Sequence, residues 1–224
     1  MKKLFSLLLT AAMLLTLAAC GIKNADTDAP DTTDDPAAAE TTDPAEEAPA
    51  EATDTTPVDA PTGEGGKTLI AYFSWSGNTA KLAQMIADET GGELFAIEPE
   101  TPYSDDYNTV VDQAKVEQNE SARPAVANRV ENWEDYNTVF VGYPNWWSDV
   151  PMVMLTFLES YDWSGKTVIP FCTSGGSRFG NGIRSITAAT SGATVLDGFH
   201  VSGSRVDHAQ SDVTEWINEL GLSK

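Results

Sequence analysis

The chain has 224 residues and a formal net charge of -21 at pH 7, because 34 Asp or Glu residues outnumber 13 Lys or Arg residues. An acidic protein repels nucleic-acid phosphates and anionic lipid headgroups, so this composition argues against a nucleic-acid-binding protein. The two cysteines and two well-separated histidines form no ligand spacing, and the sequence predicts no metal site.

Residues 1–20 predict a lipoprotein signal peptide. Lys2 and Lys3 precede a short apolar run that ends in Leu-Ala-Ala-Cys at residues 17–20. The run is short for a transmembrane helix, which needs roughly 20 apolar residues, and its layout is that of a secretory signal. The junction resembles a lipobox, which implies cleavage before Cys20, acylation of Cys20 (palmitate) and anchoring at the outer face of the cell membrane. An ordinary secretory peptide and an uncleaved anchor helix are the alternatives.

Residues 21–66 predict a disordered acidic tether. They contain thirteen Asp or Glu, one Lys and no aromatic residue. Such a segment buries too little apolar surface to offset the entropy of ordering its backbone. The remaining residues, 67–224, hold 10 Lys or Arg and 21 Asp or Glu, a net charge of -11, and form the predicted globular domain.

Within residues 67–224, short apolar runs alternate with amphipathic segments. The apolar runs predict strands at 68–73, 93–98, 138–142, 167–172 and 193–201. Helical spacing predicts helices at 79–90, 106–119, 152–161, 183–189 and 207–220. This alternation predicts an α/β domain with a doubly wound, five-stranded parallel sheet. Ligands of such sheets bind beyond the carboxyl ends of the strands, so the loops after the first, third and fourth strands are the expected functional loops.

The first of these loops has the sequence Ser-Trp-Ser-Gly-Asn-Thr at residues 74–79 and runs directly into a helix. Small and hydroxyl-bearing residues let backbone N–H groups surround a phosphate at the positive end of that helix. No Lys or Arg lies between residues 68 and 80. The loop has neither the Gly-Lys-Ser/Thr ending of a nucleotide-hydrolysing loop nor three dinucleotide-binding glycines. These features predict a monophosphate site, and the alternative is a plain N-cap.

The second and third loops, residues 142–151 and 173–180, also predict ligand contacts. The second contains adjacent tryptophans that can stack on a planar ligand or cover an edge of the core. The third, Thr-Ser-Gly-Gly-Ser-Arg-Phe-Gly, has glycines that let its backbone approach a ligand, and the alternative is a flexible turn. Cys172 and His200 lie in predicted strands and are interpreted as structural residues. No nucleophile–base pair stands out, so no catalytic residue is predicted.

The three loops, in this order, resemble those of the flavodoxin family. Ser-Trp-Ser-Gly-Asn-Thr is similar to the loop that binds the FMN phosphate, and Gly-Tyr-Pro-Asn-Trp-Trp and Thr-Ser-Gly-Gly-Ser are similar to flavin-contacting loops. The resemblance covers nearly all of residues 67–224. It implies a three-layer α/β/α fold with strand order 2-1-3-4-5 and FMN as the cofactor. The FMN-binding residues that it implies are Ser74, Ser76, Gly77, Asn78, Thr79, Pro144, Asn145, Trp146, Trp147, Thr173, Ser174, Gly175, Gly176 and Ser177.

The resemblance implies redox chemistry, and three hypotheses for the function are open, of which the first two are redox functions. The first is an extracytoplasmic electron-transfer flavoprotein that serves a redox partner protein or a small electron acceptor. The alternative is an FMN-dependent NAD(P)H:quinone-type oxidoreductase, and the third is a binding module without flavin. Unlike many electron carriers of the family, the chain has no Gly from Asn145 to Val150 and no Tyr in the third loop, where Phe179 is the nearest aromatic residue. This departure leaves room for two-electron chemistry.

Overall fold

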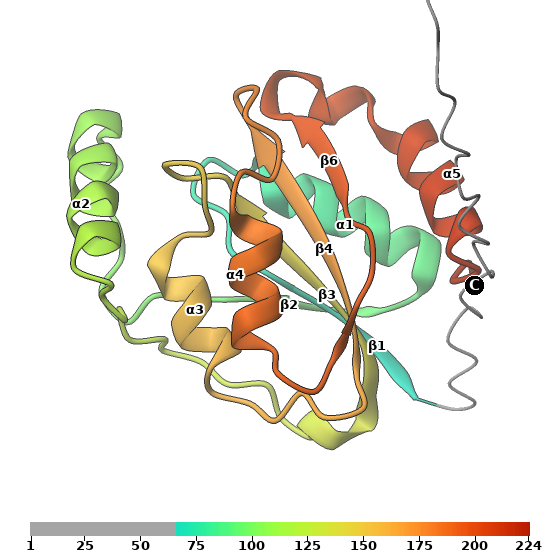
Figure 1. The fold of residues 1–224 in the computed structure, drawn as a ribbon. Helices are drawn as coiled ribbons and strands as arrows, with labels where there is room; N and C mark the ends of the chain where they lie inside the picture. The colour runs from blue at the N-terminus through green and yellow to red at the C-terminus, as the bar shows by residue number, and fades with distance from the viewer. Residues whose placement is uncertain (1–65) are drawn as a thin grey trace, which may run out of the picture. The chain divides into compact units, whose positions relative to one another are not determined.

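The computed structural model describes residues 66–224, which form the α/β domain drawn in Figure 1. The predicted signal peptide with Cys20, and the predicted tether apart from Gly66, lie outside the described residues and stay predictions. Within the described range, no helix is both long enough and apolar enough to span a membrane.

A six-stranded parallel sheet forms the centre of the described domain. Its hydrogen-bonded order is β2-β1-β3-β4-β5, and β6 also pairs with β4. The predicted doubly wound sheet with strand order 2-1-3-4-5 is therefore confirmed. The strands are β1 (Lys67–Tyr72), β2 (Glu93–Ala96), β3 (Tyr136–Pro144), β4 (Thr167–Ser174), β5 (Thr194–Val195) and β6 (Phe199–Ser202).

The predicted fifth strand, residues 193–201, is interrupted in the structure and forms both β5 and β6. Between the two registers, two residues of β4 face the three residues that join β5 to β6, which is a β-bulge. At this point β4 contains Pro170, which has no backbone N–H to donate. A Cβ at Gly198, on the bulged side, would lie 2.5 Å from the carbonyl oxygen of Pro170. The missing donor and the close backbone approach explain why one apolar run makes two strands.

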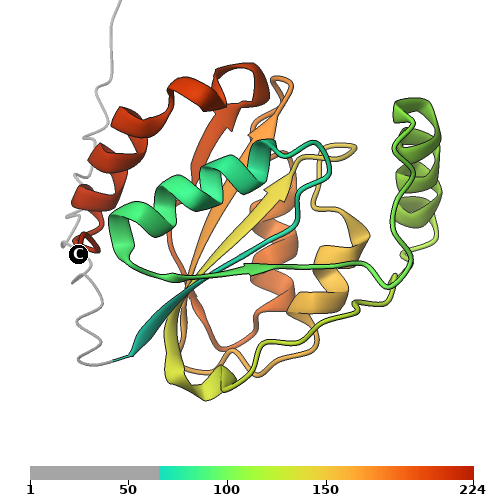
Figure 2. The same cartoon turned by 180° about the vertical axis from the view of Figure 1, so that it is seen from behind.

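Helices cover both faces of the sheet, as Figures 1 and 2 show from opposite sides. Helices α1 (Asn78–Thr90) and α5 (Gln210–Glu219) lie on one face, and α3 (Met152–Leu158) and α4 (Gly182–Ala189) lie on the other. This arrangement is the predicted three-layer fold. Helix α2 (Tyr107–Asn119) stands apart from the sheet, at the left of Figure 1.

Short 3-10 helices precede two of the regular elements. The helix η1 (Trp133–Asp135) leads into β3, and η2 (Gly203–His208) leads toward α5. The predicted last helix, residues 207–220, therefore begins later than expected, because its first residues belong to η2.

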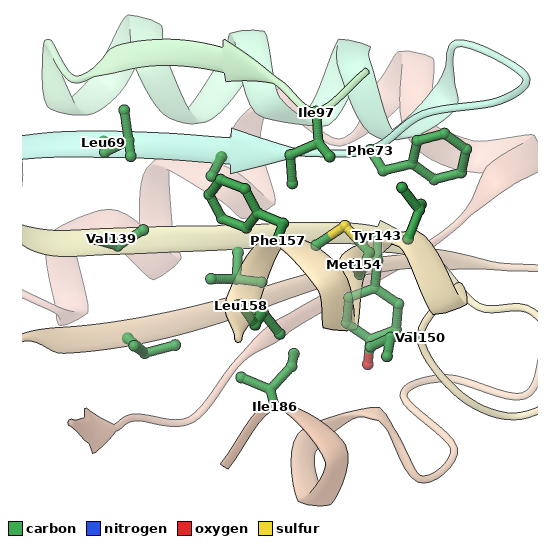
Figure 3. Packing of buried hydrophobic residues seen from close by; sticks show 14 of the residues in the cluster. Leu69, Phe73, Ile97, Val139, Tyr143, Val150, Met154, Phe157, Leu158 and Ile186 are labelled. Carbon is green, nitrogen blue, oxygen red and sulfur yellow. The ribbon is translucent and has the colours of Figure 1, made fainter. Parts of the chain in front are cut away.

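Each face of the sheet buries its own hydrophobic cluster. In β3, Val139 and Val141 belong to the cluster under α3 and α4, whereas Phe140 belongs to the cluster under α1 and α5. Alternate side chains of a strand point to opposite faces, so a strand that is covered on both faces needs an uninterrupted apolar run. Figure 3 shows the first cluster, where Phe157 and Ile186 of the covering helices meet the strands. The uninterrupted apolar runs in the sequence are therefore explained by burial of the strands on both faces.

Candidate functional site

The loops that follow β1, β3 and β4 meet at a cavity of about 680 Å³. This size is typical of sites for small molecules and cofactors. Nine of the predicted contact residues line it, namely Ser76, Asn78, Pro144, Asn145, Trp146, Trp147, Thr173, Ser174 and Gly175. Sequence reasoning missed the other lining residues, which are Trp75, Tyr107, Val110, Val111, Ala114, Ser202, Gly203 and Ser204.

Five predicted contact residues do not line this cavity. Ser74 and Gly77 line a neighbouring cavity of about 570 Å³ on the β2 side of the first loop. Thr79 is buried, and its Oγ1 lies 2.9 Å from the hydroxyl of a β4 threonine, so it ties the start of α1 to β4. Gly176 and Ser177 are exposed on the third loop.

The amino-terminal end of α1 is open to a ligand. Gly77 precedes the helix with a left-handed backbone (φ 86°), and no side chain of the described residues caps the first turn. The Lys81 N–H donates to the Gly77 carbonyl at 3.0 Å, so the three amides before it have no acceptor inside the helix. Asn78, the first residue of the helix, lines the cavity. Free amides at a helix amino terminus bind anions, so this end of the cavity is suited to a phosphate.

The second loop makes a tight turn at Trp147 and Ser148. Both residues have left-handed backbones, with φ of 51° and 63°. Around them, Trp146 and Asp149 exchange two backbone hydrogen bonds of 2.9 and 3.0 Å. Positive φ at both central positions is the type I′ pattern, which favours Asn and Gly. A left-handed residue with a side chain costs roughly 1–2 kcal/mol, so the surroundings must hold this turn in place.

The third loop and α2 provide that support. A Cβ at Gly180 would overlap the backbone of Ser148, and the following amide donates to the Ser148 carbonyl at 2.7 Å. From α2, Gln118 Nε2 donates to the Trp147 carbonyl at 3.2 Å. The indole N–H of Trp147 donates to the Val111 carbonyl at 3.0 Å. Glycine at position 180 is therefore required for the two loops to pack together.

The two predicted tryptophans have different surroundings. Trp146 is half-buried and packs edge-on against Phe73 and Tyr103, with ring centroids 5.5 and 5.1 Å away. Trp147 is 47% exposed, and Lys115 Nζ lies 4.8 Å from its ring centroid. Trp146 therefore covers an edge of the core while it lines the cavity, and Trp147 joins the second loop to α2.

Helix α2 supplies an apolar wall of the cavity through Tyr107, Val110, Val111 and Ala114. Trp75 of the first loop reaches the same wall. Its ring centroid lies 6.2 Å from that of Tyr107, and its indole N–H donates to the loop before α2 at 2.9 Å. The helical spacing of these side chains predicts a helix. It does not predict which surface of the domain the helix packs against, so these lining residues were missed.

Ser174 organises the third loop. Its Oγ accepts hydrogen bonds from the backbone N–H groups of Gly176 at 3.1 Å and Arg178 at 3.0 Å, and it lies 2.8 Å from His200 Nε2. Because both lone pairs of the hydroxyl are used, its proton points to His200, whose Nε2 acts as the acceptor. Burial and the charge of Arg178 lower the pKa of His200, which favours this neutral form. His200 thus positions the third loop through Ser174.

The cavity wall carries no formal charge. Among residues 66–224, no Asp, Glu, Lys or Arg lines it. Asn145 Oδ1 is buried without a hydrogen-bond partner in the described chain, while Asn145 Nδ2 donates to the Arg178 carbonyl at 2.6 Å. A buried acceptor that lacks a donor is costly, so a ligand N–H or O–H would be favourable at this point.

The described residues offer neither a reactive thiol nor a metal-binding cluster. Cys172 is buried, and this burial raises the pKa of its thiol to about 12, so the thiol is protonated and a poor nucleophile. Nowhere in the described part of the chain do three or more His, Cys, Asp or Glu residues gather in a way that could hold a metal ion.

Residues 67–220 match the sequence model of a family described as flavodoxin. This chain belongs to the flavodoxin family. Its structure is similar to that of a candidate flavoprotein of Bacteroides uniformis, with 34% identity and a TM-score of 0.62 over 69% of this chain and 99% of that one. A candidate flavoprotein of Bacteroides eggerthii has the same identity and TM-score, over 69% of this chain and 98% of that one.

This flavodoxin-family protein is also similar to a Lactobacillus acidophilus flavoprotein that was crystallised in complex with FMN. The two share 25% identity and a TM-score of 0.52, over 64% of this chain and 97% of the other. A comparison with curated proteins gave no match. The family and fold that the three loops predict are confirmed, while the roles of single contact residues stay predictions.

Proposed function

We propose that this protein binds FMN in the cavity between α1, α2 and the loops after β3 and β4, and that it transfers electrons at the outer face of the cell membrane. FMN is the cofactor, as membership of the flavodoxin family and the FMN-bound Lactobacillus relative indicate. One observation carries the proposal. Loops from three neighbouring strand ends surround an uncharged cavity that lies against an uncapped helix end.

The residues present fit FMN. The free amides at the start of α1 and the hydroxyl of Ser76 suit its phosphate. The unpartnered Asn145 Oδ1 can accept a hydrogen bond from an N–H or O–H group of the cofactor. Trp146 and the apolar side of α2 suit a flat ring and exclude water from it. Bound FMN supplies the redox chemistry, and the protein binds and orients it.

The membrane location is supported by the sequence alone. The lipobox-like junction at Cys20 and the acidic segment 21–66 suggest a domain on a lipid anchor, held away from the bilayer by an extended spacer. The domain would then exchange electrons with a redox partner protein or a small acceptor outside the cytoplasm.

Titration of the purified protein with FMN tests the cofactor assignment. We expect quenching of flavin fluorescence and a yellow protein that keeps its FMN through gel filtration. Asn145→Ala should weaken FMN binding about tenfold, because a buried hydrogen bond of about 1.5 kcal/mol is lost. Asn119→Ala, at the far end of α2 and outside the cavity, is the control and should bind like the wild type. A protein that neither quenches nor retains FMN would refute the assignment.

An FMN-dependent NAD(P)H:quinone-type oxidoreductase is a second candidate. It is favoured by an aromatic rim at the cavity, where Tyr107 is 66% exposed and Trp147 is 47% exposed. Such rings can stack on a planar acceptor. Rapid oxidation of NADH or NADPH by the FMN-loaded protein in the presence of a quinone would favour the reductase. Reduction by a partner protein alone would favour the electron carrier.

A further inference from the structure

Ser202 ends β6 and Gly203 and Ser204 begin η2, and all three line the same cavity as Ser76 and Asn78. In the sequence this segment lies near the other end of the domain, after the apolar run of the predicted fifth strand. The structure therefore brings a second group of small, hydroxyl-bearing residues to the end of the cavity where α1 begins.

Several contacts hold the segment in this position. The pairing of β6 with β4 makes Ser202 the register partner of Ser174, next to the third loop. A Cβ at Gly203 would lie 2.9 Å from the side-chain amide of the first α1 residue, so glycine allows the backbone to come this close. An ion pair of 2.6 Å between Lys81 and Asp207 joins α1 to η2. The segment is thus fixed relative to both the first and the third loop.

The two serine hydroxyls are suited to an anionic ligand. Ser202 Oγ and Ser204 Oγ lie 3.1 Å apart. Each hydroxyl carries one proton, so one serine can donate to the other while the second proton of the pair stays available for a ligand. Both hydroxyls can also rotate toward an anion, because within residues 66–224 neither is fixed by more than this bond.

A phosphate in this cavity needs several neutral donors. Residues 67–224 carry a net charge of -11, which repels an anion, and within the described range no Lys or Arg lines the cavity. Hydroxyl and amide groups must then supply the hydrogen bonds that a cationic side chain supplies in many phosphate sites. The start of α1 offers amides, and the segment from Ser202 to Ser204 offers hydroxyls.

We propose, on the basis of the proposed FMN site, that Ser202 and Ser204 donate hydrogen bonds to the FMN phosphate and make the protein select FMN over riboflavin. Riboflavin has the same ring and ribityl chain without the phosphate. Contacts to the phosphate therefore change the ratio of the two affinities, whereas contacts to the ring or chain change both affinities alike.

The test compares FMN and riboflavin binding by the wild-type protein and the double variant Ser202→Ala/Ser204→Ala. Fluorescence-quenching titrations give both dissociation constants. We expect the double variant to bind FMN at least about tenfold more weakly, a loss that corresponds to 1.4 kcal/mol, with riboflavin binding unchanged. The phosphorus NMR resonance of bound FMN should also move in the double variant. Ser211→Ala, an exposed serine of α5 outside the cavity, is the matched control and should leave both affinities as they are.

Other binding results would overturn either this inference or the proposed function. If the double variant keeps the wild-type ratio of FMN to riboflavin affinity, the inference is wrong while FMN binding itself stands. An equal loss for both flavins also overturns it, because the hydroxyls would then act on the ring or chain. A wild-type protein that binds neither flavin would overturn the proposed function, and this inference with it. Circular dichroism spectra of the variants establish that they are folded.

Discussion

At the scale of single residues, some side chains touch the cavity and others hold its loops in place. Asn145 lines the cavity and has a buried oxygen without a partner in the described chain, whereas Thr79, Gly180 and His200 act on the loops. The second group can be tested without any ligand, because its effects appear in the stability of the domain.

Gly180→Ala should destabilise the protein by about 2 kcal/mol. The new Cβ would overlap the backbone of Ser148, and Ala disfavours the left-handed conformation (φ 56°) of this residue. In thermal unfolding followed by circular dichroism, we expect Tm to fall by roughly 4–8 °C. Gly175→Ala is the control, because no atom lies within 4 Å of its new Cβ. Equal melting temperatures for the two variants would contradict this account of the loop contact.

The hydrogen bond between Ser174 and His200 should make stability depend on pH. The pKa of His200 lies below its ordinary value of 6.5 in the folded protein, so the folded state resists protonation. The stability that neutral His200 contributes is present above about pH 6.5 and is lost as the pH falls through the folded pKa. Protonated His200 cannot accept the Ser174 proton, whereas Gln at this position can accept at every pH. We expect Tm of the wild type to fall more than that of His200→Gln between pH 7 and pH 5, and parallel profiles would rule this out.

At the scale of elements, α2 differs from the other helices of the described domain. Only Val110 and Ala114 of its side chains are buried, and it stands apart from the sheet in Figures 1 and 2. Its hydrogen bonds to Trp147 connect it to the second loop. An element with few buried contacts opens locally at low cost, so α2 is expected to be the least stable wall of the cavity.

Trp147→Phe should loosen α2 without unfolding the domain. The substitution keeps an aromatic ring but removes the indole N–H that donates to the Val111 carbonyl. A hydrogen bond of about 1 kcal/mol corresponds to roughly fivefold faster amide hydrogen exchange by local opening. Mass spectrometry of peptides from residues 107–119 measures this rate, and peptides from α5 serve as the internal control. Unchanged exchange in α2 would show that Trp147 does not hold it.

At the scale of the whole molecule, the cavity and the predicted membrane attachment belong to different parts of the chain. The described domain carries the cavity, while the predicted attachment to a membrane depends on residues 1–66. The two can therefore be separated by substitution, because a change at the predicted anchor leaves the cavity untouched.

Cys20→Ser should release the protein from the membrane. Without the thiol, no acyl chain can be attached at the lipobox-like junction, and the acidic domain has no charge attraction to anionic lipid. In cells fed labelled palmitate, we expect the label on the wild type and on Cys172→Ala, whose replaced thiol is buried, but not on Cys20→Ser. Label that persists in Cys20→Ser, or membrane attachment without any label, would contradict the lipoprotein prediction.

Much of the fold was predictable because its signals are local. Runs such as Val139 to Val141 are apolar at every position, since both faces of the sheet are covered. The break between β5 and β6 escaped prediction, because it depends on Pro170 of a neighbouring strand, which a pattern along one strand cannot report.

The site, like the fold, was predictable in part. The compositions of the loops after β1, β3 and β4 pointed to a cavity that nine of the predicted residues do line. Thr79 stays a predicted phosphate contact through its backbone N–H, because its hydroxyl is turned into the structure and pairs with Thr173. The orientation of a side chain within a loop follows from its neighbours in space, so composition alone could not separate the buried hydroxyl of Thr79 from the cavity-lining Ser76.

By itself, the sequence determined the alternation of strands and helices, the parallel sheet and the three loops that meet at the cavity, because burial on two faces and turn chemistry act on adjacent residues. Only the tertiary structure decided that α2 and the segment from Ser202 to Ser204 complete the cavity. Those walls depend on strand register, on the bulge at Gly198 and on the contacts of Trp147, which join residues distant in the chain. Such contacts depend on which surfaces meet in space, and no local pattern specifies that.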